Sequence, residues 1–171
     1  TEIGDALGLP VQFIPRERVQ KSPVIGMGRC RTFESPSGIW SDDTSLSLCL
    51  ADSLCSGYNL QDIANKFIEW LFDGLWTPNN RAFDIGRTTM RAISNLRNGI
   101  EPKFAGLDRD RDNGNGSLMR IAPLIPYIYG LVEEQQIQII SEVSSLTHRH
   151  PRSILACIFL CKFCIQYLDI Q

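Results

Sequence analysis

The chain has 171 residues, of which 43% are hydrophobic and 21% are charged, and its formal net charge is -2. This size and apolar content suit one globular domain with a substantial core, and we expect residues 1–171 to form a single domain. The slightly acidic balance opposes a general affinity for DNA or RNA, because nucleic-acid-binding surfaces need clustered Lys and Arg.

The ends of the chain bear on its compartment. The N-terminus lacks a charged start followed by an apolar run and a small-residue cleavage site, and so we expect a cytoplasmic protein. The longest apolar run, residues 154–165, is interrupted by Lys162 and is shorter than the about 20 residues that a bilayer span needs. We therefore expect no membrane contact and interpret the run as a buried core helix.

Helical patterns dominate the sequence in chain order. Residues 1–9 resemble the end of a helix, and the Pro/Gly-rich, mixed-charge residues 10–38 predict a long surface loop that could cover a site. Apolar spacing and stop signals then predict helices within residues 41–57, 60–74, 85–98, 117–129, 132–146 and from 151 onward. Pro123 and Pro126 should break the fourth of these. No stretch alternates apolar and polar residues as a half-buried β-strand would, and so we expect an all-α fold class.

Six cysteines could suggest disulfides, but Cys157, Cys161 and Cys164 share one predicted helix, and Cys49 and Cys55 share another. We expect reduced thiols. The C-x3-C-x2-C spacing also matches the iron–sulfur pattern of radical enzymes, whose cysteines normally lie on a loop. Here the spacing puts all three thiols on one apolar helix face, which favours a packing role.

The sequence Ser41-Asp42-Asp43-Thr44 stands where the Pro/Gly-rich segment enters the next helix. A serine cap followed by acidic residues stabilises free N–H groups and the positive end of the helix dipole, and this alone explains many such sequences. The alternative is a metal site, because hard divalent cations prefer hydroxyl and carboxylate oxygens. Neighbouring carboxylates diverge on a helix, and so they suit two ions about 3.5 to 4 Å apart that take further ligands from elsewhere.

Two further segments are candidates for ligand binding. Residues 112–117 (DNGNGS) lead into a predicted helix, where glycines allow close backbone approach and the helix N-terminus attracts phosphate, although an ordinary polar turn gives the same pattern. His148 and His150 precede the last helix. Capping is the common role of such histidines, and zinc is disfavoured because no other Cys or His completes a ligand set.

Together with Gly4-Asp5-Ala6-Leu7-Gly8, these three motifs resemble, in this order, the ADP-ribosylglycohydrolase family. The resemblance spans residues 4–151. It implies a compact, multi-helix orthogonal bundle and magnesium-dependent hydrolysis of an ADP-ribosyl N- or O-glycosidic bond, which releases ADP-ribose from a modified protein or a small acceptor. The alternative is a catalytically impaired homologue that binds ADP-ribose or is purely structural.

The resemblance also implies site residues. The S-D-D-T sequence is similar to the family's T-D-D-T motif, so the ligands of two magnesium ions, with manganese as the alternative, would be Ser41, Asp42 and Asp43. The D-N-G-N-G-S-L-M-R sequence is similar to N-G-x-x-M-R and would contact the ribose and phosphates of ADP-ribose through Asp112, Asn113, Asn115, Gly116 and Ser117. His148 matches a ligand-contacting histidine, and we expect Asp112 to accept a proton during hydrolysis.

Two departures from the family pattern affect these expectations. Many members have Glu at the position of Gln12, and an amide is neither a base nor a strong cation ligand at neutral pH. Family members also run to about twice this length, and a D-x-D-T motif in their second half supplies further metal carboxylates. This sequence has no such motif, and we expect a fold that is truncated on the C-terminal side.

Overall fold

The structure is a computed structural model, which describes residues 2–30 and 32–168. Over these residues the structure is helical and has no β-strand. It has two isolated β-bridges, which pair Cys30 with Ser35 and Leu107 with His148. The predicted all-α class is confirmed. The elements are α1 Glu2–Gly8, η1 Leu9–Val11, α2 Arg16–Lys21, α3 Asp42–Leu54, α4 Leu60–Asp73, α5 Arg87–Arg97, α6 Pro102–Ala105, α7 Leu124–Ile128, α8 Glu133–Ser145 and α9 Pro151–Leu168.

The long helices begin and end where side-chain chemistry favours it. The Asn59 side chain caps α4 by accepting hydrogen bonds from the N–H groups of Gln61 and Asp62. Gly74 ends α4 with a φ of 77°, and a Cβ there would lie 2.3 Å from the carbonyl oxygen of Asn80. Only glycine fits this left-handed and crowded position.

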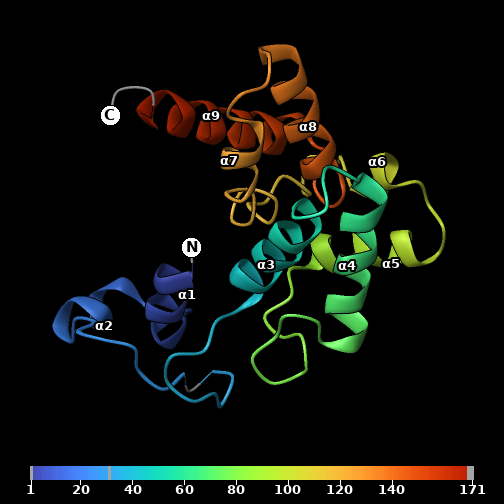
Figure 1. The fold of residues 1–171 in the computed structure, drawn as a ribbon. Coiled ribbons are helices and arrows are strands. Elements are labelled where there is room, and N and C mark those ends of the chain that lie inside the picture. Colours follow the sequence, from blue (N-terminus) through green and yellow to red (C-terminus); the bar gives the residue numbers. More distant parts are fainter. Residues whose placement is uncertain (1, 31, 169–171) are drawn as a thin grey trace.

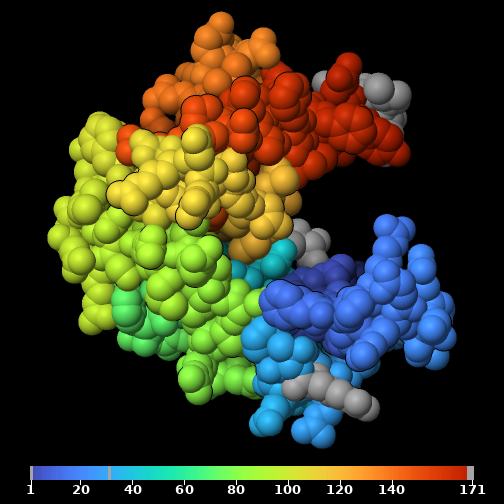
Figure 2. Space-filling model, turned by 180° about the vertical axis from the view of Figure 1, so that it is seen from behind, coloured from blue at the N-terminus to red at the C-terminus, as the bar shows by residue number. Residues whose placement is uncertain are grey.

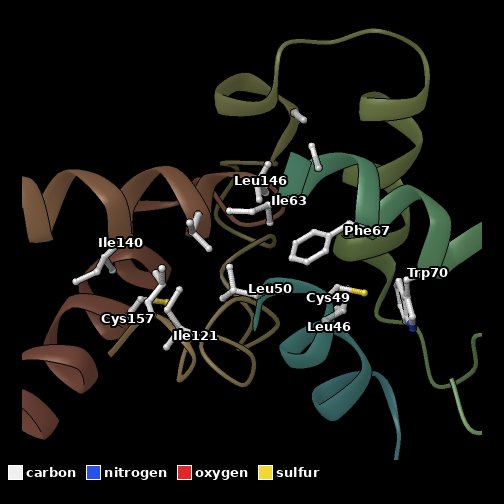
Figure 3. Packing of buried hydrophobic residues seen from close by; sticks show 14 of the residues in the cluster. Leu46, Cys49, Leu50, Ile63, Phe67, Trp70, Ile121, Ile140, Leu146 and Cys157 are labelled. Atoms are coloured by element: carbon white, nitrogen blue, oxygen red, sulfur yellow. The ribbon is translucent and has the colours of Figure 1, made fainter. Parts of the chain in front are cut away.

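One hydrophobic cluster runs through the molecule from Trp70 on α4 to Ile140 on α8 and Cys157 on α9 (Figure 3). Phe67, Leu50 and their neighbours on α3 and α4 fill its centre and are completely buried. Burial of this apolar surface is the main stabilising contribution to the fold, at about 25 cal/mol per Å². The cluster fixes the start of α3 relative to the segment that precedes α9, and these two places contain the predicted site residues.

The helices are arranged as two arms around this centre (Figure 1). The N-terminal segment with α1 and α2 forms one arm, the segment α7 to α9 forms the other, and α3 to α6 lie between them. The space-filling view shows the molecule hollowed between the blue N-terminal arm and the red α9 (Figure 2). Segments that are distant in the sequence therefore face a shared opening.

Helix α9 differs from the expected buried core helix. Its buried positions, Ser153, Cys157, Cys161 and Ile165, form one face, whereas 22% of the helix is buried in total. Phe159 and Phe163 are 73% and 68% exposed, because α7 and α8 cover only the opposite face. Among the described helices, α9 alone is long and apolar enough to cross a membrane by length and composition, whereas its sequence suggested a shorter run.

The cysteines behave largely as predicted. All six are free thiols. Cys157 and Cys161 are buried in the core, and Cys164 is half-buried at its edge, so a packing role describes two of the three thiols on α9.

Three expectations about short elements were wrong. The predicted loop over residues 10–38 contains the end of η1 and all of α2. The predicted helix over residues 117–129 is helical only in α7, and the expected break occurs at Pro123, the N-cap of α7, whereas Pro126 lies inside the first turn of α7. Helix α6 was not expected. It has four residues and begins at Pro102, and so it is too short for a periodic signal.

Candidate active site

A polar pocket of about 270 Å³ lies where the start of α3, the start of α5 and the 114–116 loop meet. It brings together residues from across the chain, among them Asp42, Asp43, Asn115 and His148, which the sequence analysis named. Its lining consists of Gln12, Asp42, Asp43, Asp84, Gly86, Arg87, Thr88, Thr89, Gly114, Asn115, Gly116, Met119 and His148.

Asp5 on α1 fixes the start of α3. Its Oδ2 accepts hydrogen bonds from the backbone N–H of Ser41 at 2.9 Å and from the N–H and hydroxyl of Thr44 at 3.1 and 2.8 Å. The Ser41 hydroxyl donates to Asp5 Oδ1 at 2.8 Å and lies 3.4 Å from the Asp43 N–H, from which it accepts. Ser41 is therefore the N-cap of α3 and is already bonded to Asp5, and its role as a metal ligand stays a prediction.

Three carboxyl groups converge in the pocket, namely Asp42, Asp43 and Asp84. Burial, together with the negative charges of Asp43, Asp84 and Asp5, raises the pKa of Asp42 from 3.8 to about 8. Burial also raises the pKa of Asp43, helped by Asp5, and burial raises that of Asp84. Burial and mutual repulsion therefore disfavour the ionised form of these carboxyl groups. A bound cation or a bound proton would relieve this cost.

Gln12 completes the acidic side of the pocket. Its amide Nε2 donates to Asp84 Oδ2 at 2.6 Å, which connects the segment after η1 to the loop before α5. Its amide oxygen Oε1 is buried and has no hydrogen-bond partner among the described residues. An orphaned buried carbonyl beside three carboxyl groups is an oxygen ligand of the type that Mg²⁺ and Ca²⁺ accept.

The opposite wall of the pocket is the loop that contains Gly114, Asn115 and Gly116. A Cβ on Gly116 would lie 2.5 Å from His148 Cε1 and 3.0 Å from the Thr89 hydroxyl, so only glycine allows the loop to pass this close. The Ser153 hydroxyl donates to the Gly114 carbonyl oxygen at 3.2 Å and holds the loop against the start of α9. The loop therefore presents backbone groups to the pocket directly above the imidazole.

His148 is held as a neutral imidazole. It is 3% exposed, and burial, together with the charge of Arg120, lowers its pKa to about 4. Arg120 Nη2 donates to the Thr147 hydroxyl oxygen at 2.6 Å, and that oxygen lies 2.9 Å from His148 Nδ1. The Thr147 hydroxyl can donate to Nδ1 or accept from it, because accepting from Arg120 leaves the oxygen a second lone pair as well as its hydrogen. With its ring hydrogen on Nε2, His148 would donate a hydrogen bond on the side of the glycine loop.

Arg120 is the buried support of this arrangement. It is fully buried, stacks at 4.6 Å over the Phe67 ring and lies 3.4 Å from the Val143 carbonyl oxygen, to which it donates. Burial lowers its pKa to about 10, and so it remains charged at neutral pH. A charged group at this depth requires such partners, since its desolvation is costly.

The structure places four predicted site residues outside the pocket lining, and one of them is Ser41, the N-cap of α3. Asp112 lies across Thr88 in a neighbouring hollow, with its Oδ1 3.4 Å from the Thr88 hydroxyl. Ser117 is fully buried, and its hydroxyl lies 2.9 Å from that of Ser144 in the core. Within the described part of the chain, the pocket lining includes Asn115 but not Asn113.

Sequence reasoning missed Asp5 as a cap, Asp84 in the pocket and Arg120 as a support. Asp84 has a φ of 57°, and it precedes Gly86 at the start of α5, so an acidic residue just before a helix was the available signal. Arg120 stands in the apolar stretch L-M-R-I-A-P-L, where a lone charge indicates a buried partner network. Neither signal says which distant segment completes the contact.

The side chains fit part of a divalent-cation site. Asp42, Asp43, Asp84 and the Gln12 amide oxygen are hard oxygen donors on one wall of the pocket. Among the described residues, no three carboxylate, imidazole or thiolate side chains are close enough to hold an ion on their own. A metal at this place would therefore need water and further ligands.

Comparisons with known proteins agree with the geometry. The chain is 34% identical to the ADP-ribosylarginine hydrolase Tri1 of Pseudomonas putida (strain GB-1) over 91% of this chain and 41% of that protein. It is 35% identical to the ADP-ribosylarginine hydrolase Tri1 of Serratia proteamaculans (strain 568) over 97% of this chain and 44% of the relative. The chain thus spans less than half the length of these relatives.

A solved structure titled ADP-ribosylglycohydrolase-related protein complex has the same fold, with a TM-score of 0.80 and 27% identity over 98% of this chain and 53% of that chain. The bundle type expected from the sequence is therefore confirmed. The sequence model of the family described as ADP-ribosylglycohydrolase matches residues 2–169. With the match extending over nearly its whole length, the chain belongs to the ADP-ribosylglycohydrolase family.

Proposed function

We propose that the protein to which this chain belongs hydrolyses the glycosidic bond between ADP-ribose and an arginine side chain, in a magnesium-dependent reaction. The observation that carries the proposal is one pocket in which Asp42, Asp43 and Asp84 face a glycine loop and a neutral His148. The choice of arginine rests on the names of two relatives that share 34% and 35% of their aligned residues with the chain.

The two walls of the pocket would bind different parts of the substrate. The acidic wall suits the hydroxyl groups of the ribose next to the scissile bond, because carboxylates accept hydrogen bonds from them. The loop of Gly114, Asn115 and Gly116, together with the Nε2–H of His148, supplies donors and close backbone approach for the diphosphate. A neutral imidazole donates without adding a charge that would pair with the aspartates.

Asp42, Asp43, Asp84 and Gln12 Oε1 would supply some of the ligands of a pair of divalent cations, magnesium or manganese, at the acidic wall, and water and further ligands would supply the rest. When bound, such ions polarise the ribose and lower the pKa of a coordinated water. The residues of this chain would orient the anomeric carbon toward that wall, where ionised carboxylates would stabilise the developing positive charge.

Proton transfer would involve a carboxylate inside the pocket. Asp112 was expected from the sequence to accept the proton, but it lies across Thr88 in the next hollow. Asp84 is better placed, because Gln12 holds its Oδ2 and leaves Oδ1 for a water molecule. Burial raises the pKa of Asp84, which makes it a stronger base than a solvated aspartate.

The test uses the full-length protein and a peptide with ADP-ribosylated arginine. Asp42→Asn and Asp84→Asn should each lower ADP-ribose release by about 100-fold or more, while circular dichroism stays unchanged. EDTA should abolish wild-type turnover and magnesium should restore it. Asp73→Asn, on the exposed end of α4, is the matched control and should retain activity. Wild-type release that is unaffected by EDTA and by both site variants would exclude the proposal.

A second candidate is ADP-ribose binding without hydrolysis, and Gln12 favours it. Its amide oxygen stands on the acidic wall, and a neutral amide adds no negative charge there and cannot act as a base. Calorimetry with ADP-ribose, with and without magnesium, measures binding separately from turnover. Binding without any product release assigns the protein to this second class.

A further inference from the structure

A second polar hollow, of about 560 Å³, adjoins the candidate active site. Four arginines line it: Arg87 and Arg91 from α5, and Arg109 and Arg111 from the loop that follows α6. In the space-filling view, α5 and this loop lie on the face shown, where yellow-green meets yellow (Figure 2). The hollow is therefore basic, whereas the neighbouring pocket is acidic.

The four guanidinium groups are unpaired within residues 2–30 and 32–168. None of them forms a hydrogen bond, ion pair or ring contact with another described residue. The two acidic residues of the hollow have other neighbours, since Asp110 lies 3.8 Å from His150 Nε2 and Asp112 lies next to the Thr88 hydroxyl. Like charges that converge without partners repel one another, and a bound anion would relieve this repulsion.

The hollow shares lining residues with spaces on both sides. Arg87 and Thr88 line both it and the candidate active site. At its other end, Arg91, Arg109 and Asp112 also line a third hollow of about 300 Å³, which adds the apolar side chains of Met90 and Leu107. The three adjoining hollows are here taken together as one groove, which begins at the carboxyl pocket and ends at Met90 and Leu107.

The length and lining of this groove indicate a polypeptide. A diphosphate would occupy only a small part of the space and would leave Met90 and Leu107 without a partner. A peptide offers carboxylates for the arginines, amide groups for Thr88 and Asp112, and apolar side chains for Met90 and Leu107. Arg forms strong, often bidentate bonds with carboxylates, so acidic side chains are the preferred partners.

We propose that this groove, here called the arginine groove and defined by Arg87, Arg91, Arg109 and Arg111, binds an acidic segment of the ADP-ribosylated protein next to the modified residue. The proposal rests on the proposed function, because the modified residue must enter the carboxyl pocket. The arginine groove selects among substrate proteins by sequence charge, whereas the carboxyl pocket recognises the ADP-ribosyl group that all of them share.

The first test measures substrate selection by the full-length enzyme. Two peptides carry the same ADP-ribosylated arginine, flanked by glutamates in one and by glutamines in the other. Arg91→Gln combined with Arg109→Gln should raise KM for the glutamate peptide by about tenfold, the equivalent of two lost charge-assisted contacts of modest strength, without changing kcat. KM for the glutamine peptide should stay the same. Equal changes for both peptides would overturn the proposal.

A control separates local from general charge effects. Arg16→Gln combined with Arg18→Gln removes two exposed arginines from α2, outside the arginine groove. This variant has the same net charge as the double variant of the groove and should keep the preference for the glutamate peptide. If it loses that preference equally, long-range charge and not the arginine groove selects the substrate, and the proposal is wrong.

The second test does not need turnover. An unmodified, fluorescein-labelled glutamate peptide should bind the wild-type protein, with an affinity that falls as salt rises and that the two groove substitutions weaken about tenfold. Inorganic pyrophosphate at equal charge should compete poorly. Strong, groove-dependent competition by pyrophosphate would reassign the groove to phosphate. Peptide binding in a protein that lacks hydrolase activity would support the groove and contradict only the proposed reaction.

Discussion

Asp42 is a carboxyl group with 5% of its surface exposed at the start of α3. Its pKa rises from 3.8 to about 8 on folding, so over that interval the folded protein retains a proton that the unfolded chain has released. The metal-free protein should therefore lose stability as the pH rises from about 4 to about 8. Asp42→Asn should remove part of this loss and should be more stable than wild type near pH 8 by at least about 1.4 kcal/mol, the equivalent of one pKa unit.

Urea unfolding in EDTA near pH 5 and near pH 8 measures this effect. Asp73→Asn, which changes an exposed carboxylate on α4, is the control and should follow the wild-type pH dependence. Added magnesium should stabilise wild type near pH 8 more than it stabilises Asp42→Asn, because a ligand of the folded state stabilises it in proportion to its occupancy. If Asp42→Asn shows the wild-type pH dependence, the carboxyl group is not held in a desolvated position.

Gly116 allows the loop to pass over His148. In Gly116→Ala the new Cβ would lie 2.5 Å from the imidazole, and the loop or the ring would have to move. We expect a loss of about 1–3 kcal/mol in stability and a weaker affinity for ADP-ribose. Gly114→Ala is the matched control, because its Cβ would lie 3.7 Å from His148 Nε2, in ordinary contact. Calorimetry with ADP-ribose compares the two variants, and equal affinities would contradict the close approach.

At this scale the sequence located part of the pocket. Asp42, Asp43, Asn115 and His148 line it together, as expected from motifs that are distant in the sequence. Asp84 escaped notice because its position depends on a bond to Gln12 across 72 residues, which no local pattern records. The order of the motifs indicates which segments lie together in the fold. It does not indicate which other side chains line the pocket between them.

In helix α9, burial of a residue does not follow from its hydrophobicity. Ile165 lies on its buried face with 9% exposure, whereas Leu155 is 51% exposed, although both are aliphatic residues of one helix. Ile165→Ala should lower the free energy of unfolding by about 2 kcal/mol or more, and Leu155→Ala by less than about 1 kcal/mol. Thermal or urea unfolding of the two variants measures the difference. Equal losses would place the core on a different face of α9.

Periodicity predicted the longer helices because each buries a repeating face, and α3, α4, α5, α8 and α9 lie close to the expected ranges. Prediction was weaker where no repeat can develop. Helices α2 and α6 have six and four residues, and the stretch before α7 is governed by prolines and by contacts of the buried Arg120. The apolar composition of α9 suggested a buried core helix, but a sequence does not record how many neighbours cover a helix.

The N-terminal arm of the molecule is joined to the central helices through Asp5. Its carboxylate accepts hydrogen bonds from the backbone and hydroxyl groups of Ser41 and Thr44, and so it connects α1 to the start of α3 and to the acidic wall of the pocket. Asp5→Ala would leave these donors without their charged acceptor. We expect a loss of about 2 kcal/mol in stability, the typical cost for a hydrogen bond to a charged group.

Limited proteolysis shows whether this loss is local to the arm. Arg16 and Arg18 on α2 are exposed trypsin sites. If Asp5 holds the arm in place, Asp5→Ala should be cleaved there faster than wild type under conditions where the central helices stay intact, since local opening precedes global unfolding. Glu2→Ala alters an exposed acid of the same helix and should be cleaved at the wild-type rate. Unchanged cleavage of Asp5→Ala would mean that apolar contacts such as those of Ala6 and Leu9, rather than the carboxylate, attach the arm to the site.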